Sequence, residues 1–176
     1  MDARDAEGRN PIDAIVGRKT IALQTGIQLE AAWGIMSQFG QSVQDAGLDY
    51  ELPSSTLLPT STLTNNSNAV VASLLYTIGI DVQKNMPFYA INNALGSNTI
   101  LNISSILIGT SQSDIIVGAG GNDTIRGGAN NDTIYGDYNP LIDLKDYNDE
   151  TDIIGNDSLY GGSGNDVMFG GGGIDI

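Results

Sequence analysis

Aspartates recur at nine-residue intervals in the last third of the chain, each behind a glycine-rich stretch. Carboxylate and carbonyl oxygens are the ligands that hard cations such as Ca²⁺ prefer, and turns rich in glycine expose backbone carbonyls. The spacing therefore predicts a row of cation-binding loops. The three complete copies begin with Gly118, Gly127 and Gly161, and they carry Asp123, Asp132 and Asp166 at the sixth position.

Partial copies continue the same phase on both sides. Gly109 leads to Asp114 with a degenerate loop between them, and Gly170 leads to Asp175 just before the chain stops. A further copy opens at Gly136 and closes through Asp157, with an insertion at about residues 138–154. This copy spans residues 136–160, which is one nonapeptide plus about sixteen residues, so we expect the insertion to lengthen one loop and leave the strand order unchanged.

Positions seven to nine of each copy are short β-forming triplets such as Thr124-Ile125-Arg126. Side chains alternate along a strand, so the eighth position is predicted to point inward and the seventh and ninth to face solvent in the middle copies. One buried aliphatic side chain contributes about 1.5–3 kcal/mol, which does not offset about 1–2 kcal/mol of ordering entropy for each of nine residues. A bound ion must therefore add stability. The eighth-position residues are Ile116, Ile125, Ile134, Leu159 and Met168.

Each nonapeptide is predicted to form half a coil, so loops two copies apart stack on the same side. The first column of loops would carry Asp114, Asp132 and Asp166, and the second column would carry Asp123, Asp157 and Asp175. Stacked carboxylates repel without an ion between them, so metal binding and folding are expected to be one event. We therefore expect residues 101–176 to be largely disordered without Ca²⁺.

The segment from about residue 106 to residue 176 resembles the RTX family of haemolysin-type calcium-binding repeats, whose motif is G-G-x-G-x-D-x-U-x. The resemblance implies a right-handed parallel β-roll with an ion between successive loops of a column, held by both aspartates and by loop carbonyls. Up to about four such sites follow, at the pairs 114/132, 132/166, 123/157 and 157/175. The implied metal ligands are Asp114, Gly118, Gly120, Asp123, Gly127, Ala129, Asp132, Asp157, Gly161, Ser163, Asp166, Gly170, Gly172 and Asp175.

Composition limits the function further. The chain of 176 residues has a formal net charge of −14, which disfavours nucleic acid as a partner. Residues 101–176 hold 12 acidic and 2 basic side chains, against 9 and 5 in residues 1–100. The chain has no cysteine and no histidine, so His-based and Cys-based zinc sites and catalytic units are excluded. Since no catalytic motif occurs either, we expect that this chain is not an enzyme.

The first hundred residues resemble no family known to us. Residues 1–52 are predicted to be mainly helical, with one helix at about 20–46 that places an apolar side chain on one face every three or four residues and ends before Gly47. Residues 53–68 read as a polar linker, because 13 of these 16 residues are Ser, Thr, Pro or Asn. Residues 69–100 read as a mixed region with a short helix at about 86–95, and the β-roll is predicted to follow at 101–176. The fold class is therefore α+β.

No amino-terminal secretory signal is present: acidic residues stand where a basic region should be. The longest apolar stretch, residues 69–80, is too short to span a bilayer. The family resemblance implies a bacterial protein exported by a type I system that folds outside the cell on meeting Ca²⁺. Because the chain stops inside a copy, we expect the roll to be truncated there, with the export signal absent. A secreted lipase or protease, a pore-forming toxin and a surface adhesin remain the alternatives for the protein to which this segment contributes.

Overall fold

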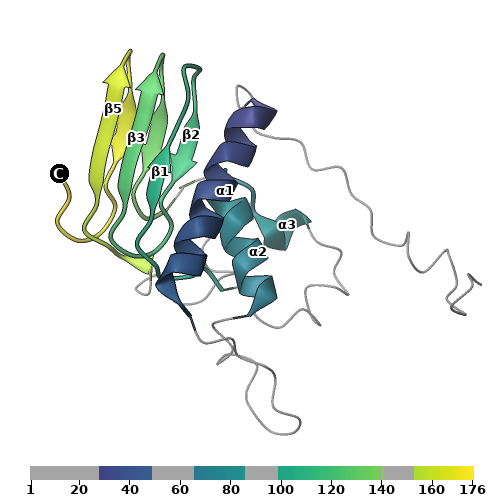
Figure 1. Ribbon diagram of the computed structural model, residues 1–176. Coiled ribbons are helices and arrows are strands. Elements are labelled where there is room, and N and C mark those ends of the chain that lie inside the picture. The colour runs from purple at the N-terminus through teal and green to yellow at the C-terminus, as the bar shows by residue number, and fades with distance from the viewer. Residues whose placement is uncertain (1–27, 49–65, 86–98, 139, 141–152) are drawn as a thin grey trace, which may run out of the picture.

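The computed structural model describes residues 28–48, 66–85, 99–138, 140 and 153–176, and Figure 1 shows that helices and strands occupy separate parts of the molecule. The helices are α1 (Leu29–Ala46), α2 (Ser67–Tyr76) and α3 (Val82–Asn85). The strands are β1 (Ile106–Ile108), β2 (Ile115–Val117), β3 (Thr124–Ala129), β4 (Thr133–Tyr135), β5 (Ser158–Ser163) and β6 (Val167–Phe169).

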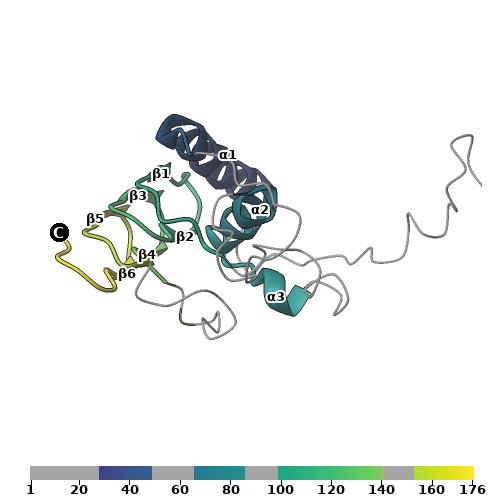
Figure 2. The same ribbon diagram turned by 90° about the horizontal axis from the view of Figure 1, so that it is seen from below.

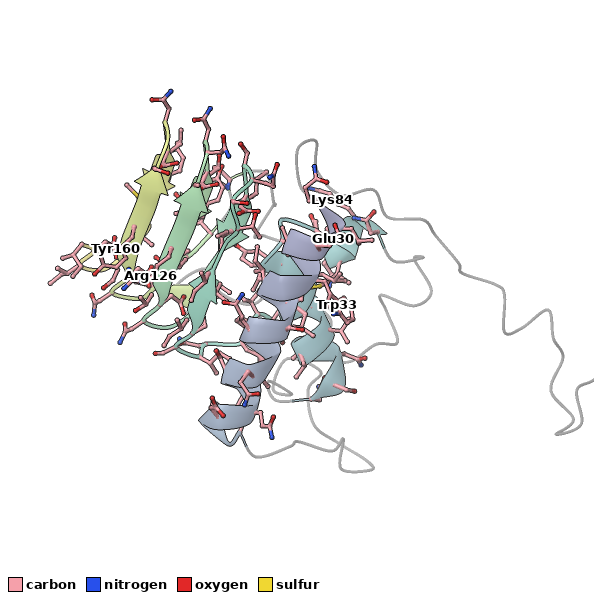
Figure 3. All side chains as sticks on the ribbon, turned by 45° about the horizontal axis from the view of Figure 1, so that its top comes forward. Glu30, Trp33, Lys84, Arg126 and Tyr160 are labelled. Carbon is pink, nitrogen blue, oxygen red and sulfur yellow. The ribbon has the colours of Figure 1, made fainter. Side chains whose placement is uncertain are left out.

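Helix α1 forms because apolar residues recur four apart along one face. Ala31, Ile35 and Phe39 are buried, and the helix ends at Gly47, whose φ of 59° is the left-handed conformation that glycine favours. The predicted end of this helix is therefore confirmed. Trp33, in contrast, is 68% exposed, and Figure 3 shows it on the helical side of the molecule.

Helix α2 takes up most of the apolar segment 69–82, for which the sequence did not separate helix from strand. The Asn66 side chain caps the helix by accepting hydrogen bonds from the backbone N–H groups of Asn68 and Ala69, at 2.9 and 3.1 Å. Within the described residues, no helix is both long and apolar enough to cross a membrane. The predicted short helix at 86–95 lies outside those residues, as do the first residues of the helix predicted at 20–46.

The strands form two parallel three-stranded sheets, ordered β1-β3-β5 and β2-β4-β6. Ile106 pairs with Thr124, 18 residues on, and Thr124 pairs with Ser158, 34 residues on. The second sheet shows the same two steps, from Ile115 to Thr133 and from Thr133 to Val167. The longer step contains the insertion, so the extra residues lengthen a loop and leave the strand order intact, as predicted. Figure 2 shows the two sheets as neighbouring layers with α1 and α2 beside them.

The core runs without a break from the helices into the sheets. It joins Phe39 and Tyr76 to a row of inward-facing strand residues. The predicted inward direction of the eighth position is confirmed for Ile116, Ile125 and Ile134, whose side chains are 0% exposed. Leu159 is partly buried and packs against the same core. Met168 departs from the expectation: it is 47% exposed, because no described residue covers β6 on that side. The fully buried strand residues at this position are Leu107, Ile116, Ile125 and Ile134.

Tyr135 corrects the expectation that ninth positions of the middle copies face solvent. Its side chain is only 8% exposed. The ring of Tyr135 stacks on the ring of Phe169, with centroids 5.2 Å apart and planes inclined by 8°. In the other sheet, the guanidinium of Arg126 lies 4.5 Å from the centre of the Tyr160 ring, a pair labelled in Figure 3. Ninth-position side chains therefore pack against each other between neighbouring strands.

Candidate calcium-binding loops

The aspartates at the sixth position form the two columns that the sequence predicted. In the first column the backbone N–H of Asp114 donates to Oδ1 of Asp132 at 2.9 Å, and that of Asp132 donates to Oδ1 of Asp166 at 3.0 Å. The second column repeats the pattern from Asp123 through Asp157 to Asp175, at 2.8 and 3.0 Å. Each bond links equivalent positions of neighbouring strands in one sheet. One carboxylate oxygen of every later aspartate thus holds the loop before it in register.

One carboxylate oxygen has no protein partner at four of these positions. Oδ2 of Asp123, Asp132 and Asp157 is buried and makes no hydrogen bond, and the same holds for Oδ1 of Asp114. All four residues are at most 2% exposed. A buried carboxylate oxygen without a partner is costly, because its hydration is lost and nothing replaces it. These oxygens require either a cation or a proton.

Carbonyl oxygens of the next loop in the same column, two copies further along the chain, lie close to these carboxylates. A methyl group placed on Gly118 would lie closer than 3.0 Å both to the Gly136 carbonyl oxygen and to Oδ2 of Asp123. The same test at Gly127 meets the Gly161 carbonyl and Oδ2 of Asp132. Gly109 and Gly136 give the corresponding result, each with one carbonyl and one aspartate oxygen. Calcium takes oxygen ligands at about 2.3–2.6 Å, so a carbonyl and a carboxylate that converge on one small space fit this ion.

Burial raises the pKa values of these aspartates. The pKa of Asp123 rises from 3.8 to about 8, first through loss of hydration and then through the nearby charges of Asp157 and Asp137, although bonds from Ser105 oppose the rise. Burial is also the largest cause of the raised pKa values of Asp132 and Asp157, with neighbouring aspartates adding to both. The carboxylates are therefore poised to exchange a proton for a positively charged ion.

The third-position residues of the predicted ligand set lie in the stacked loops. Ala129 and Ser163 are paired in the ladder between β3 and β5. Gly120 forms an isolated parallel β-bridge with Asn102, which precedes β1. The Gly172 N–H donates to Oδ2 of Asp137 at 2.6 Å. The predicted residues are thus distributed over successive loops. Within the described residues, no group of three or more acidic side chains is placed to hold an ion.

Asp137 is a functional candidate that the sequence pattern did not single out. It takes the second position of its copy and is 1% exposed. Its Oδ1 accepts from Gly155 N–H at 2.8 Å, and its Oδ2 accepts from Gly172 N–H at 2.6 Å. Burial, followed by the charge of Asp157, raises the pKa of Asp137 to about 7. The available signal was an acidic residue where the other copies have glycine, alanine or threonine.

Asparagines at the fifth position form a second ladder that was also missed. Oδ1 of Asn122 accepts from Asn156 N–H at 2.7 Å, and Oδ1 of Asn156 accepts from Ile174 N–H at 2.7 Å. In the first column Oδ1 of Asn131 accepts from Asn165 N–H at 2.8 Å. The aspartates accept from the loop before them, whereas the asparagines accept from the loop after them. Neighbouring loops are therefore tied together by side chains in both directions.

One more copy precedes those recognised in the sequence, at residues 100–108. Its strand is β1, and Ser105 occupies the position of the aspartate. The backbone N–H and the hydroxyl of Ser105 both donate to Oδ1 of Asp123, at 2.7 and 2.8 Å. The sequence gave little sign of this copy because it lacks both the glycines and the aspartate of the motif. It extends the second column by one uncharged member.

Stacked loops with glycine at position one and aspartate at position six define a nonapeptide-repeat structure whose loops suit a hard cation. Residues 108–137 and 154–176 match the RTX calcium-binding nonapeptide repeat family, in four copies. The segment therefore carries RTX calcium-binding repeats, as the pattern predicted, and the match supports calcium binding by these residues. The interval between the matched ranges coincides with the insertion. No curated protein and no solved structure matches the chain.

Proposed function

We propose that residues 101–176 bind several calcium ions between stacked loops and that this binding drives their folding into a right-handed parallel β-roll. The ions lie at the aspartate pairs 114/132, 132/166, 123/157 and 157/175, with first-position and third-position carbonyls completing the ligand sets. Calcium supplies the positive charge that these carboxylates lack. The chain supplies a fixed register of loops, because each aspartate uses its other oxygen to bind a neighbouring backbone N–H.

The observation that carries the proposal is the set of buried carboxylate oxygens without a protein partner. At Asp123, Asp132 and Asp157 the unpaired oxygen and a glycine carbonyl oxygen of the next loop in the column approach the same glycine. Calcium needs six to eight oxygens in a flexible arrangement. Two aspartates and several carbonyls meet that need without any histidine or cysteine, of which the chain has none.

Circular dichroism tests the coupling of binding to folding. In a chelator at pH 8 we expect the β-signal of the repeats to be absent, and millimolar Ca²⁺ should restore it. The same concentration of Mg²⁺ should not, because Mg²⁺ demands octahedral geometry and gives up water reluctantly. Identical spectra in chelator and in Ca²⁺ would refute the proposal.

The number of ions is tested by calorimetric titration together with native mass spectrometry. Up to four ions are expected. A smaller number would mean that some of the four aspartate pairs do not bind calcium, while the remaining pairs do. The sites that use Asp166 and Asp175 are expected to be the weakest, because these two side chains are more exposed than the other aspartates of their columns. A tighter site at Asp175 than at Asp114 would contradict this order.

RTX repeats are typical of secreted bacterial proteins, and we extend the proposal to this chain. It acts as a structural module of an exported protein, kept unfolded in a calcium-poor cytosol and folded where calcium is near millimolar. Type I export is the route that this scheme implies. The module is proposed to bind calcium without catalysing a reaction. Detection of the chain in the medium of a producing strain, and a screen for lipase and protease activity with no turnover, test both points.

A further inference from the structure

The first strand of each sheet contacts the helical part of the molecule, and backbone groups on that side of the strand are hydrogen-bonded to it. Gln38 of α1 donates from Nε2 to the Ile108 carbonyl oxygen at 3.0 Å, and the Ile108 N–H donates to Oε1 of Gln38 at 2.7 Å. The carboxamide of Gln38 thus makes the two hydrogen bonds that a neighbouring strand would make to β1. Figure 1 shows α1 running alongside β1.

The second sheet begins on a similar contact. The N–H of Val117, at the end of β2, donates to the carbonyl oxygen of Thr77 at 3.1 Å, just after α2. The Leu101 N–H donates to the buried hydroxyl of Ser73 in α2 at 2.8 Å. Both sheets therefore start from hydrogen bonds to the helices, and none of these bonds involves a carboxylate.

Apolar packing at this end of the sheets is also independent of any ion. Phe39 and Tyr76 are fully buried in the same cluster as Leu107. Each buried side chain of this size contributes about 1.5–3 kcal/mol. The core here is formed by two helices and the sheets together, whereas a middle copy of the repeat adds one inward side chain. The core at this end is therefore thicker than in the middle copies, and its stability does not depend on a bound ion.

Ser105 removes the remaining reason for a calcium requirement. In the later copies two aspartates of one column face each other, and their charges oppose stacking until a cation binds. In the first copy the hydroxyl and the N–H of Ser105 both donate to Oδ1 of Asp123. The N–H bond is shared with the later copies, whereas the hydroxyl of Ser105 takes the place of a second carboxylate, so this contact is favourable without metal.

We infer that α1, α2 and residues 99–108 form a calcium-independent template, and that the calcium-binding copies fold by stacking on it from the amino-terminal side. The inference rests on the proposed function, because it assigns the point from which calcium-driven folding proceeds. The template presents β1 with one edge bonded to Gln38 and the other free to receive β3. It also presents the Ser105 donors to the first calcium-binding loop of the second column.

Hydrogen exchange of the full chain, followed by mass spectrometry, tests this inference. In chelator at pH 8, the amides of α1 and α2 and those of Leu101 and Ile108, which bond to the helices, are expected to exchange at least about ten-fold more slowly than those of 118–137 and 154–176. Adding Ca²⁺ should slow exchange in the repeats and at Ile103 and Ser105, whose partners lie in the repeats. If Ca²⁺ leaves the repeats unchanged, the proposed function fails. If the repeats respond but the template is unprotected in chelator and gains protection together with them, the inference alone fails.

Two substitutions of Ser105 isolate the role of charge in the docking of the first calcium-binding loop. Ser105→Asp would set a second carboxylate against Asp123, so the Ca²⁺ concentration at which residues 118–126 reach half of their protection should rise. Ser105→Asn has the shape of that variant without its charge, so it should leave this concentration close to that of the unaltered chain. The same Ca²⁺ concentration for both variants would show that charge at position 105 does not control the docking of this loop.

A second pair of variants tests the contact with α1. Gln38→Ala removes both bonds to Ile108 and should speed exchange of the Ile108 amide in chelator by about five-fold, as expected for the loss of roughly one net hydrogen bond. Gln41→Ala is the matched control, because Gln41 bonds only to Gln44 and Asp45 within its own helix. Equal exchange in the two variants would contradict the proposed role of α1.

Discussion

At the scale of single residues, the two carboxylate oxygens of a loop aspartate have different roles. One oxygen of Asp132 accepts a backbone N–H from the loop before it, and the other is buried and unpaired. The first task fixes the register of the loops, and the second leaves a charge that the protein does not neutralise. Such a residue stabilises the stack only when a cation or a proton supplies the missing partner.

The raised pKa values predict how stability depends on pH when calcium is absent. The pKa of Asp123 rises from 3.8 in the unfolded chain to about 8 in the fold, so between these values the folded state binds more protons than the unfolded state. The free energy of unfolding should therefore be greatest below about pH 4 and fall as the pH rises to about 8. Circular dichroism in chelator should show more β-structure at pH 5 than at pH 8. A signal that increases with pH would contradict this prediction.

Asp132 is predicted to be the most sensitive aspartate of the first column, because it belongs to two of the proposed pairs. Asp132→Asn keeps an oxygen that can accept the N–H of Asp114 and removes the charge. We expect the calcium concentration at half-folding to rise by about ten-fold or more, since affinity follows the number of charged ligands.

The matched control for this change is Asp45→Asn. Asp45 is exposed near the end of α1, and within the described residues its side chain accepts a hydrogen bond only from Gln41. The same loss of charge there should change the calcium midpoint by less than about two-fold, as expected for a screened surface charge. Equal shifts in the two variants would show that general charge, and not a specific ligand, controls the midpoint.

At the scale of elements, the loop geometry depends on glycine where the chain passes closest to an oxygen. Gly118→Ala would place a methyl group in the space shared by the Gly136 carbonyl and Asp123. We expect a loss of about 1–3 kcal/mol in Ca²⁺, as for other overpacked sites, and a weaker calcium site. Thermal unfolding and calcium titration measure the two effects.

Gly34→Ala in α1 serves as the comparison for that substitution. A methyl group at Gly34 meets nothing within 4 Å, and alanine favours a helix interior by about 0.5–1 kcal/mol over glycine. This variant should therefore raise the stability of the calcium-loaded protein and leave its calcium affinity unchanged. Destabilisation by both substitutions would indicate that the environment of Gly118 is not special.

The nine-residue period was sufficient to predict much of this arrangement. A fixed period places Asp114 and Asp132 in one column regardless of the residues between them, and alternation along a strand places Ile125 inside. What the period did not reveal were residues that act outside its motif. Ser105 lacks the aspartate signature, and Asp137 stands at a position where the motif expects glycine. The stacking of Tyr135 on Phe169 depends on a partner 34 residues away in the sequence, which a local pattern does not contain.

At the scale of the whole molecule, the register of the sheets is separate from the length of one loop. Pairing continues from Ile125 to Leu159 across the insertion without a change of face. Loop-closure entropy grows slowly with length. Adding about eight Gly and Ser residues within 141–152 should therefore change the calcium midpoint by less than about three-fold.

The same insertion placed between Gly127 and Gly128 is the contrasting case. Gly128 pairs with Gly162 in the ladder of β3 and β5, and added residues there displace the ladder and the aspartate that follows it. We expect loss of calcium-induced β-structure in this variant, measured by circular dichroism. Retention of that structure would show that the stack tolerates insertion at any loop.

The separation of the molecule into a helical part and a part made of repeats was visible in the sequence only as a change in composition. The acidic, glycine-rich end and the apolar helices were predicted as separate segments, and the proposed boundaries at 52, 68 and 100 stay predictions. The contacts that join the halves, from Gln38 to Ile108 and from Thr77 to Val117, could not be predicted, because a glutamine on a helix has many possible partners.

The pairing of Gln38 with β1 also bears on solubility. A parallel sheet ends in a row of unsatisfied backbone groups, which can recruit strands from other molecules and start aggregation. Here a helix lies along that row, and its glutamine occupies the hydrogen-bonding groups of Ile108. A strand from another molecule therefore finds the N–H and carbonyl groups of Ile108 already bonded. Gln38 thus also protects this edge of the sheet against pairing with strands of other molecules.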